Sequence, residues 1–448
     1  MSESRSDRGG PPRRRTVLAT AAAGLTTALT GTLTGCSGTT AGGGASSRGI
    51  RLTFSWWGND DRAERTVKAV RLFEQEHPGV TVATTTTGFA PYIQKLATQA
   101  AGGGIPDVAQ LDYRQISQYA RGGALIPLGD SIEGGAIRTD EMDQDFLRTG
   151  MSDGKQYALP MGSGITGYAY DSALYRKAGI STPRPSWTWR EWADANREIA
   201  ALRLRGPNGR LVTGAGDGGG NEDVFETWLR SRGGRLYSEE GAIAFSEDDL
   251  TEFWTFCDQL RRDGAISAAK DTVQSNSTEN SPLGRGISGA DFNWNATYPA
   301  FRTLLGDAIR FAPVPTTDGH PGTYFKPSML LGIGAHTAHP EEAAALIDFL
   351  LNDERAGDAL GFTRSTPPNH AIAGRLAKDL EGPELETYQY AQVMERYGLD
   401  APPTAPPRGD VAVQTAFSRT YQRVMYELTG PRQAARELIA AANRELRS

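Results

Sequence analysis

Cysteine is scarce in this chain of 448 residues, and the scarcity excludes one class of small secreted protein. Only Cys36 and Cys257 occur, which is too few for a disulfide framework. Cys257 lies in an amphipathic helical pattern over residues 253–260, so we expect a buried thiol that packs as a small hydrophobic side chain. The chain is long enough to fold as two or more domains.

A large excess of positive or negative charge is also missing. The 47 Lys and Arg residues nearly balance the 53 Asp and Glu residues, which gives a net charge of −6 at pH 7. Such a small imbalance implies neither nucleic-acid binding nor a polybasic membrane-binding surface. The 38% hydrophobic and 22% charged residues are typical of a soluble globular protein.

Complete catalytic and metal-binding motifs are absent as well. The Gly-Ser-Gly at 162–164 is shorter than the Gly-x-Ser-x-Gly of a nucleophile elbow. His336 and His339 have no third ligand nearby and do not form a His-Glu-x-x-His motif. The glycine-rich stretch 214–220 lacks the lysine and hydroxyl residue of a phosphate-binding loop. We therefore expect no metal, no cofactor and no nucleotide.

The first 36 residues predict an export signal rather than part of the fold. Residues 13–18 contain a twin-arginine pattern, and the apolar run that follows is too short and too polar to span a bilayer. The run ends in Leu-Thr-Gly-Cys at 33–36, which resembles a bacterial lipobox. We therefore expect cleavage before Cys36 and its lipidation, with the protein anchored at the extracellular face of the cytoplasmic membrane. Residues 37–49, rich in Gly, Ser and Thr, predict a flexible tether.

The stretch 51–62 predicts a strand, a break and a helix. Apolar and polar residues alternate up to a break at Trp57, and Asp61 with Glu64 three residues later predicts a helix-capping box. A second strand is expected from Val80, which gives a βαβ unit at the start of an α/β domain with a mostly parallel sheet.

Polar and aromatic residues gather where these strands end. Trp57, Asn59 and Asp60 follow the first strand, and Asp112 follows a later one. Ligands bind beyond the carboxyl ends of strands in such sheets. An aromatic face beside short polar side chains suits a sugar. The alternative is that Trp56 and Trp57 are core and rim residues, which is the commoner fate of Trp.

A second α/β region is expected after a glycine-rich crossing segment at 161–164. Trp189 and Trp192 lie three residues apart on a predicted helix and are expected in its core. Residues 291–298 are again aromatic and amide-rich. The chain beyond Pro340 is predicted to be helical apart from the proline-rich connector 401–407.

Taken in order, these stretches resemble a known family. The signal, Ser-Trp-Trp-Gly-Asn at 55–59, His-Pro-Gly-Val-Thr-Val at 77–82, Gly-Ile-Pro-Asp-Val at 104–108, the segment 159–174 and the helix 340–351 are similar to extracellular solute-binding proteins of carbohydrate ABC transporters (family 1). The resemblance covers essentially the whole mature chain.

This resemblance implies a type II periplasmic-binding-protein-like fold, an α/β fold with a cleft between two lobes joined by hinge segments. The implied boundaries are 50–160 for the first part of lobe 1, 161–325 for the first part of lobe 2, 326–365 for the return to lobe 1, and 366–448 for the helical end of lobe 2. It also implies a sugar or oligosaccharide bound with high affinity, delivery to the permease subunits of an ABC importer, no catalysis, and a monomer.

The resemblance also implies a set of sugar-binding residues. These are Trp57, Asn59, Asp60, Asp112, Trp228, Asn293, Trp294, Asn295 and Arg364. Arg62 lies inside the helix after the first loop and is left out of the set. We interpret Arg62, Lys95 and Arg364 as solvated side chains, so a neutral oligosaccharide is favoured over an acidic one.

Two other classes of protein are alternatives to this interpretation. A secreted carbohydrate-active hydrolase or lyase is the enzyme alternative, because sequence alone does not show whether two carboxylates face each other. A surface adhesin would be expected to carry repeats or long Thr- and Pro-rich stalks, and the sequence has neither. Sugar binding linked to transport is the favoured interpretation.

Overall fold

The computed structural model describes residues 49–447. The predicted signal 1–36 with Cys36, and the predicted tether 37–49 except its last residue, lie outside the described residues.

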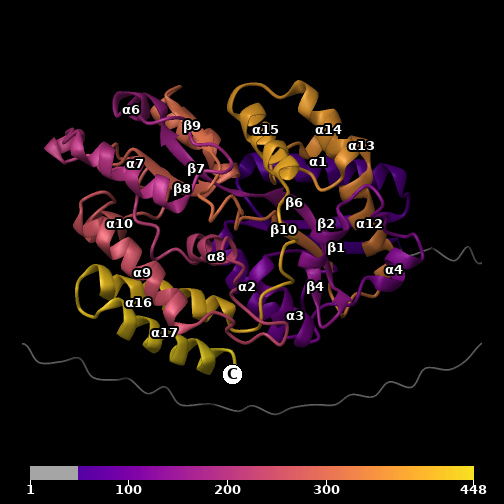
Figure 1. The fold of residues 1–448 in the computed structure, drawn as a ribbon. Coiled ribbons are helices and arrows are strands. Elements are labelled where there is room, and N and C mark those ends of the chain that lie inside the picture. The colour runs from indigo at the N-terminus through magenta and orange to yellow at the C-terminus, as the bar shows by residue number, and fades with distance from the viewer. Residues whose placement is uncertain (1–48, 448) are drawn as a thin grey trace, which may run out of the picture. The chain divides into compact units, whose positions relative to one another are not determined.

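The first lobe is built on a five-stranded sheet with the order β2-β1-β3-β10-β6. Its strands are β1 (Ile50–Trp57), β2 (Val80–Thr87), β3 (Val108–Leu111), β6 (Ala158–Gly164) and β10 (Lys326–Ile333). β1 is parallel to β2 and β3, as predicted, while β10 is antiparallel to both of its neighbours. A strand from residues 326–333 therefore returns to complete the sheet begun at the amino end (Figure 1).

Helices from two separate stretches of the sequence, residues 60–147 and 340–376, cover this sheet. They are α1 (Asp60–Glu76), α2 (Phe89–Ala101), α3 (Ile116–Arg121), α4 (Gly129–Glu133), α5 (Gln144–Leu147), α12 (Pro340–Asn352), α13 (Glu354–Leu360) and α14 (His370–Leu376). Phe54 of β1, Phe73 of α1 and Leu346 of α12 are fully buried in one hydrophobic core. The predicted capping box at Asp61 is wrong. Asn59 has an extended backbone and accepts the amide hydrogen of Arg62, so α1 begins at Asp60.

The second lobe has its own, smaller sheet with the order β8-β7-β9. Its strands are β7 (Thr166–Asp171), β8 (Ala290–Trp294) and β9 (Ile309–Ala312), and β7 is antiparallel to both neighbours. Its helices are α6 (Ser172–Lys177), α7 (Trp189–Ala201), α8 (Glu222–Arg230), α9 (Glu247–Arg262), α10 (Ala269–Thr272), α11 (Tyr298–Leu305), α15 (Gly382–Tyr397), α16 (Asp410–Met425) and α17 (Pro431–Glu445). Trp189, Trp192 and Cys257 are buried in a second core, as predicted.

Short elements complete the described chain. They are the hairpin β4 (Met151–Ser152) and β5 (Lys155–Gln156), and the 3-10 turns η1 (Tyr113–Gln115), η2 (Arg148–Gly150), η3 (Pro207–Gly209), η4 (Asn295–Thr297) and η5 (Ala377–Asp379).

Three crossing segments connect the lobes. They are residue 165 between β6 and β7, residues 313–325 between β9 and β10, and residues 377–381 between α14 and α15. The amide of His370 in α14 donates to the carbonyl oxygen of Glu141, and Arg375 pairs with Asp358 of α13. We therefore propose lobe boundaries at these three segments. This proposal places α14 on the first lobe, whereas the sequence had assigned residues 366–448 to the second.

Candidate functional site

Trp57 lies against the first lobe rather than in open solvent. Its side chain is 7% exposed, and its ring lies 5.4 Å from the rings of both Phe89 and Tyr92 of α2. Its carbonyl oxygen accepts hydrogen bonds from Gln110 (3.2 Å) and Arg62 (3.3 Å). In this arrangement Trp57 fixes the end of β1 and presents little ring surface to a ligand.

The two polar residues after Trp57 are exposed, and one of them has a structural contact. The Oδ1 of Asn59 accepts the amide of Arg62 at 3.0 Å and caps α1. Asp60 is exposed in the first turn of α1, where a carboxylate is favoured by the partial positive charge of the helix end.

Trp228 and Arg364 were predicted to contact sugar, but both are buried. Trp228 is 4% exposed and packs on Phe225 and Phe253 in the second core. Arg364 is 3% exposed and donates to Gln110 and Thr66, each at 2.9 Å.

The reading of Arg364 as a solvated side chain is therefore wrong. Burial, with a smaller effect of nearby Arg62, lowers its pKa to about 9, because a charged guanidinium is disfavoured away from water. Its hydrogen bonds hold the interior of the first lobe together.

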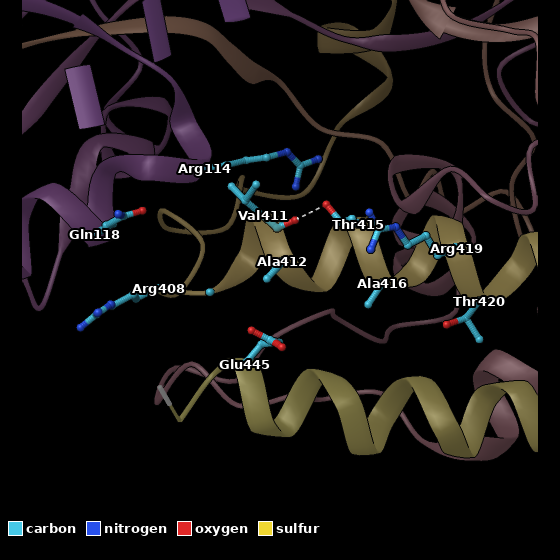
Figure 2. Close-up of a pocket in the computed structure, with 11 residues that line it drawn as sticks. Arg114, Gln118, Arg408, Val411, Ala412, Thr415, Ala416, Arg419, Thr420 and Glu445 are labelled. Carbon is cyan, nitrogen blue, oxygen red and sulfur yellow. Dashed lines mark hydrogen bonds between the residues drawn. The ribbon is translucent and has the colours of Figure 1, made fainter. Parts of the chain in front are cut away.

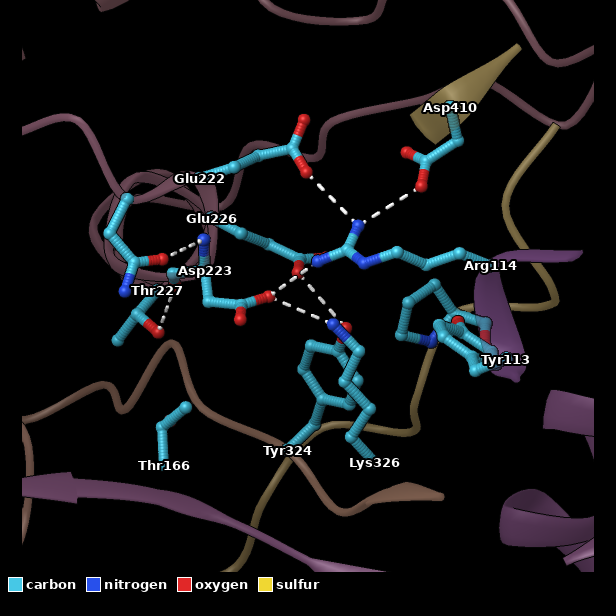
Figure 3. A network of polar contacts seen from close by, with 12 residues as sticks. Tyr113, Arg114, Thr166, Glu222, Asp223, Glu226, Thr227, Tyr324, Lys326 and Asp410 are labelled. Carbon is cyan, nitrogen blue, oxygen red and sulfur yellow. Dashed lines mark hydrogen bonds and ion pairs between the residues drawn. The ribbon is translucent and has the colours of Figure 1, made fainter. Parts of the chain in front are cut away.

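Asp112 lies at the start of a charged region between the lobes. It follows β3, and its Oδ1 accepts the amide of Arg114 at 3.0 Å. Burial raises the pKa of Asp112 above its usual value. The turn capped by this carboxylate directs the side chain of Arg114 toward the second lobe (Figure 3).

Arg114 of the first lobe contacts three carboxylates of the second. It pairs with Glu222 at 3.1 Å and with Asp223 at 3.0 Å, both at the start of α8, and with Asp410 of α16 at 3.0 Å (Figure 3). The three carboxylate side chains are 3%, 17% and 0% exposed. These ion pairs define the closed arrangement, by which we mean the lobe arrangement seen in this structure.

Lys326 extends the network toward an aromatic ring. Its Nζ pairs with Asp223 at 2.8 Å and lies 5.3 Å from the Trp294 ring and 5.6 Å from the Tyr113 ring. Ammonium groups at such distances are attracted to aromatic faces. The half-buried Trp294, a predicted site residue, thus lies beside the charged network.

The two amides beside Trp294 differ in their roles. The Oδ1 of buried Asn295 accepts the amide of Ile165 at 3.0 Å, on the first crossing segment. Asn293 is half-buried, accepts a hydrogen bond from Thr297 at 2.6 Å, and lines a small cavity of about 60 Å³ together with Trp294. Asn295 therefore stabilises the first crossing segment. Asn293 has a cavity beside it that leaves room for a ligand group.

The charges in the network shift one another's pKa values. Burial alone would lower the pKa of Arg114, but the carboxylates of Asp223, Asp410 and Glu222 outweigh it and raise that pKa well above its usual value. Burial, reinforced by Asp410, raises the pKa of Glu222 to about 8. Burial would also raise the pKa of Asp223, but Lys326 and Arg114 lower it to about 2. At neutral pH the network therefore contains both an ionised and a protonated carboxyl group.

A cavity of about 520 Å³ lies beside this network. Its walls come from the first lobe (Tyr113, Arg114, residues 151–154), the second lobe (Glu226, Arg230, residues 235–239) and the proline-rich connector 402–407. The Tyr113 hydroxyl donates to the carbonyl oxygens of Pro403 and Thr404 and so holds the connector on the first lobe. The volume falls in the range of small-molecule sites.

A second cavity, of about 770 Å³, lies along α16 (Figure 2). One face of α16 forms its floor, and Arg114 and Gln118 of the first lobe stand at its edge (Figure 2). The two cavities share Arg114 as a lining residue.

Sequence reasoning missed Arg114, Glu222, Asp223, Lys326 and Asp410. A signal existed for two of them, because the acidic pair at 222–223 follows a glycine-rich stretch and opens a helix. Lys326 and Asp410 lie more than 200 residues from Arg114, so only the fold brings them to it.

Residues 49–447 contain neither a membrane-spanning helix nor a metal-binding cluster of side chains. No helix there has the length and apolar character needed to cross a membrane. No group of three or more His, Cys, Asp or Glu side chains there is arranged to hold a metal ion.

The chain is similar to known proteins over most of its length. Residues 59–356 match the model of the bacterial extracellular solute-binding protein family. A family 1 extracellular solute-binding protein from Alicyclobacillus acidocaldarius is 28% identical, with a TM-score of 0.70, covering 89% of this chain and 99% of that one. A periplasmic oligogalacturonide-binding protein from Yersinia enterocolitica, solved with digalacturonic acid, is 24% identical, with a TM-score of 0.72 and coverage of 89% and 99%.

Curated relatives are matched over a shorter region. Binding proteins of Brucella abortus and Brucella suis are 30% identical over 121 residues, which is 26% of this chain and 28% of theirs. The family match covers more than half of the chain, and the two lobes match those of solved solute-binding proteins. The chain belongs to the bacterial extracellular solute-binding proteins.

Proposed function

We propose that this chain binds a sugar or oligosaccharide between its lobes and delivers it to the permease subunits of an ABC importer. The observation that carries the proposal is the network around Arg114, in which two cations and several carboxylates of both lobes meet beside Trp294 and a cavity of about 520 Å³. The sugars bound by structurally similar proteins, namely digalacturonic acid and mannotriose, agree with this class of ligand.

The chemistry of the network suits hydroxyl groups. Carboxylates accept hydrogen bonds from sugar hydroxyls, guanidinium and ammonium groups donate to sugar oxygens, and an indole face packs against apolar C–H surface. With the lobes apart, water or sugar would replace the ion pairs of Arg114. With sugar bound, closure would place these groups around it from both sides.

The proposed contact residues combine predicted and newly found positions. They are Asn59, Asp60, Asp112, Asn293 and Trp294 from the sequence, with Arg114, Glu222, Asp223 and Lys326 from the structure. We propose that Trp57, Trp228, Asn295 and Arg364 support the site through the packing and hydrogen bonds described above.

We further propose that the protein is a monomeric lipoprotein without enzymatic activity. The twin-arginine pattern and the Leu-Thr-Gly-Cys at 33–36 support export and lipidation of Cys36. Two or more acyl chains would give a stable anchor at the extracellular face of the membrane. We keep a neutral sugar as the expected ligand. Its affinity should change little with salt, because screening acts on accessible charges over about 8–10 Å.

A glycan array followed by calorimetric titration tests the proposed function. The purified protein is titrated with each sugar that the array identifies, and the sugar is then recovered and analysed by chromatography. Saturable binding with unchanged sugar supports the proposal. Conversion of the sugar would favour the hydrolase or lyase alternative, and an array without any binding would contradict a sugar ligand.

A further inference from the structure

A pocket of about 260 Å³, which we call the hinge pocket, lies beside the second crossing segment, apart from the cavity of about 520 Å³ that we propose binds sugar. Pro402 is the one lining residue that it shares with the cavity of about 520 Å³. Phe325 of the second crossing segment lines it, as does Ser163, whose backbone exchanges hydrogen bonds with that of Thr366. Of the three crossing segments, the second therefore contributes to the pocket directly, through Phe325.

Both lobes contribute walls to this hinge pocket. Phe146 comes from α5 of the first lobe, and Tyr388 and Ala391 come from α15 of the second. Phe146 and Ala391 are 5% and 6% exposed, and Pro367 adds further apolar surface. A ring or a short alkyl chain would bury its surface against these walls.

The charge of the hinge pocket is of one sign. Four carboxylates line it, those of Asp143, Asp145, Glu395 and Asp400, while no Lys or Arg is among its lining residues. The cavity of about 520 Å³ differs, because Arg114, Lys326 and four further arginines line it.

Three of the four carboxylates already have a contact. Asp143 caps the amide of Phe146 at 3.0 Å, Asp145 lies 3.8 Å from Arg148, and Asp400 lies 3.1 Å from His320. Glu395 is exposed and forms no ion pair within residues 49–447. Since Asp143 is satisfied by an uncharged amide and Glu395 has no cation beside it, the rim keeps a negative potential that favours a cation.

We propose that the hinge pocket binds a small organic cation, an ammonium group on a compact apolar or aromatic body, and that this ligand favours the closed arrangement. The pocket has the described shape while Arg114 joins the lobes. Because its walls belong to both lobes, movement at the hinge changes that shape. A ligand that fits it better in the closed arrangement shifts the lobes toward closure. If the proposed sugar site is correct, the two ligands then strengthen each other's binding, since such coupling is reciprocal.

Binding of 2-phenylethylammonium to the full protein, measured by calorimetry, tests the first part of this inference. Phenylacetate is the matched probe, with the same ring and the opposite charge. We expect saturable binding at one site for the ammonium compound and none for the carboxylate. Equal binding of both probes, or binding of neither, would overturn the inference.

Variants locate the probe. Glu395→Gln, at an exposed position, should weaken binding about threefold, a typical effect of one exposed charge pair. Ala391→Met should fill the pocket and abolish binding, with a thermal melt to verify folding. Asp248→Asn, on the distant helix α9, is the control and should bind normally. Unchanged affinity in both pocket variants would place the probe elsewhere and contradict the proposal.

The coupling is measured by titrating sugar with and without the saturating ammonium probe. A higher sugar affinity with the probe present is expected, and an unchanged affinity would refute the conformational part. If the probe binds but no sugar does, the proposed function is contradicted, whereas the proposal that the hinge pocket binds an organic cation is still supported.

Discussion

Replacing Arg114 with methionine tests whether the ion pairs between the lobes control closure. The substitution keeps an apolar stem but removes the cation from Glu222, Asp223 and Asp410, which lie 3.0–3.1 Å from it. Removing one partner of a buried ion pair typically costs about 3–5 kcal/mol. Glu222 has a pKa of about 8 and is largely protonated at pH 7. Because one of the three partners is then neutral, the lower end of the range, about 3 kcal/mol, is expected.

This cost should fall on the closed arrangement rather than on folding. Arg114 belongs to the first lobe and its partners to the second, so separation of the lobes returns the carboxylates to water. A change of about 3 kcal/mol corresponds to more than a hundredfold shift of the equilibrium between closed and open forms. Small-angle scattering should therefore show a larger radius of gyration for the variant, and its thermal unfolding should change little.

Arg197→Met is the matched control. Arg197 pairs with Asp263 at 3.0 Å, within the second lobe, and the two side chains are 41% and 28% exposed. An exposed pair contributes about 0–1 kcal/mol, so neither scattering nor melting should change much. The reasoning would be refuted if Arg114→Met melted far below the parent protein while its scattering curve stayed the same. Arg114 would then stabilise the fold and not the closed arrangement.

Three further predictions concern single residues. The pKa of Glu222, raised to about 8 by burial, means that the folded protein holds a proton that the unfolded chain releases near pH 4. The resulting stability is full below about pH 4 and is lost as the pH rises toward 8, on the order of 5 kcal/mol in all. Glu222→Gln should flatten this slope in melts from pH 4.5 to 9, and an unchanged slope would contradict it. Trp294→Ala should weaken sugar binding by about 2 kcal/mol with little loss of stability. Trp57→Ala should instead destabilise the protein by about 3–5 kcal/mol. Calorimetric titration and thermal melting of both variants test this, and the reverse pattern would place the sugar-binding ring at Trp57. Cys36→Ala should block maturation and abolish labelling by a fatty-acid analogue, and undiminished labelling would exclude lipidation at that residue.

The fold was predictable where local pattern and tertiary structure agree. The first strand appears where the sequence predicts it, and burial alternates from Arg51 to Phe54, although Ser55, Trp56 and Trp57 are then all buried. The start of α1 was misplaced because Asp61 and Asn59 both have side chains that cap helices. Only the backbone conformation decides between two such neighbours.

The site was less predictable because it depends on burial and on distant contacts. Trp228 and Trp294 look alike in sequence, yet the first is in the core and the second is half-buried beside Lys326. Arg114 follows a strand in an ordinary polar turn, and its partners come from α8 and α16. No local pattern shows that these segments meet. An aromatic or charged residue at a strand end is therefore only a candidate for ligand contact, and the structure is needed to show whether its side chain is exposed.

Hydrogen exchange with and without bound sugar tests the central claim most directly. The claim is that sugar binds between the lobes, at the network around Arg114. It predicts that sugar slows exchange at the same time in residues 112–118 of the first lobe and in residues 221–230 and 290–298 of the second. Protection confined to one lobe, or found only away from these segments, would contradict it.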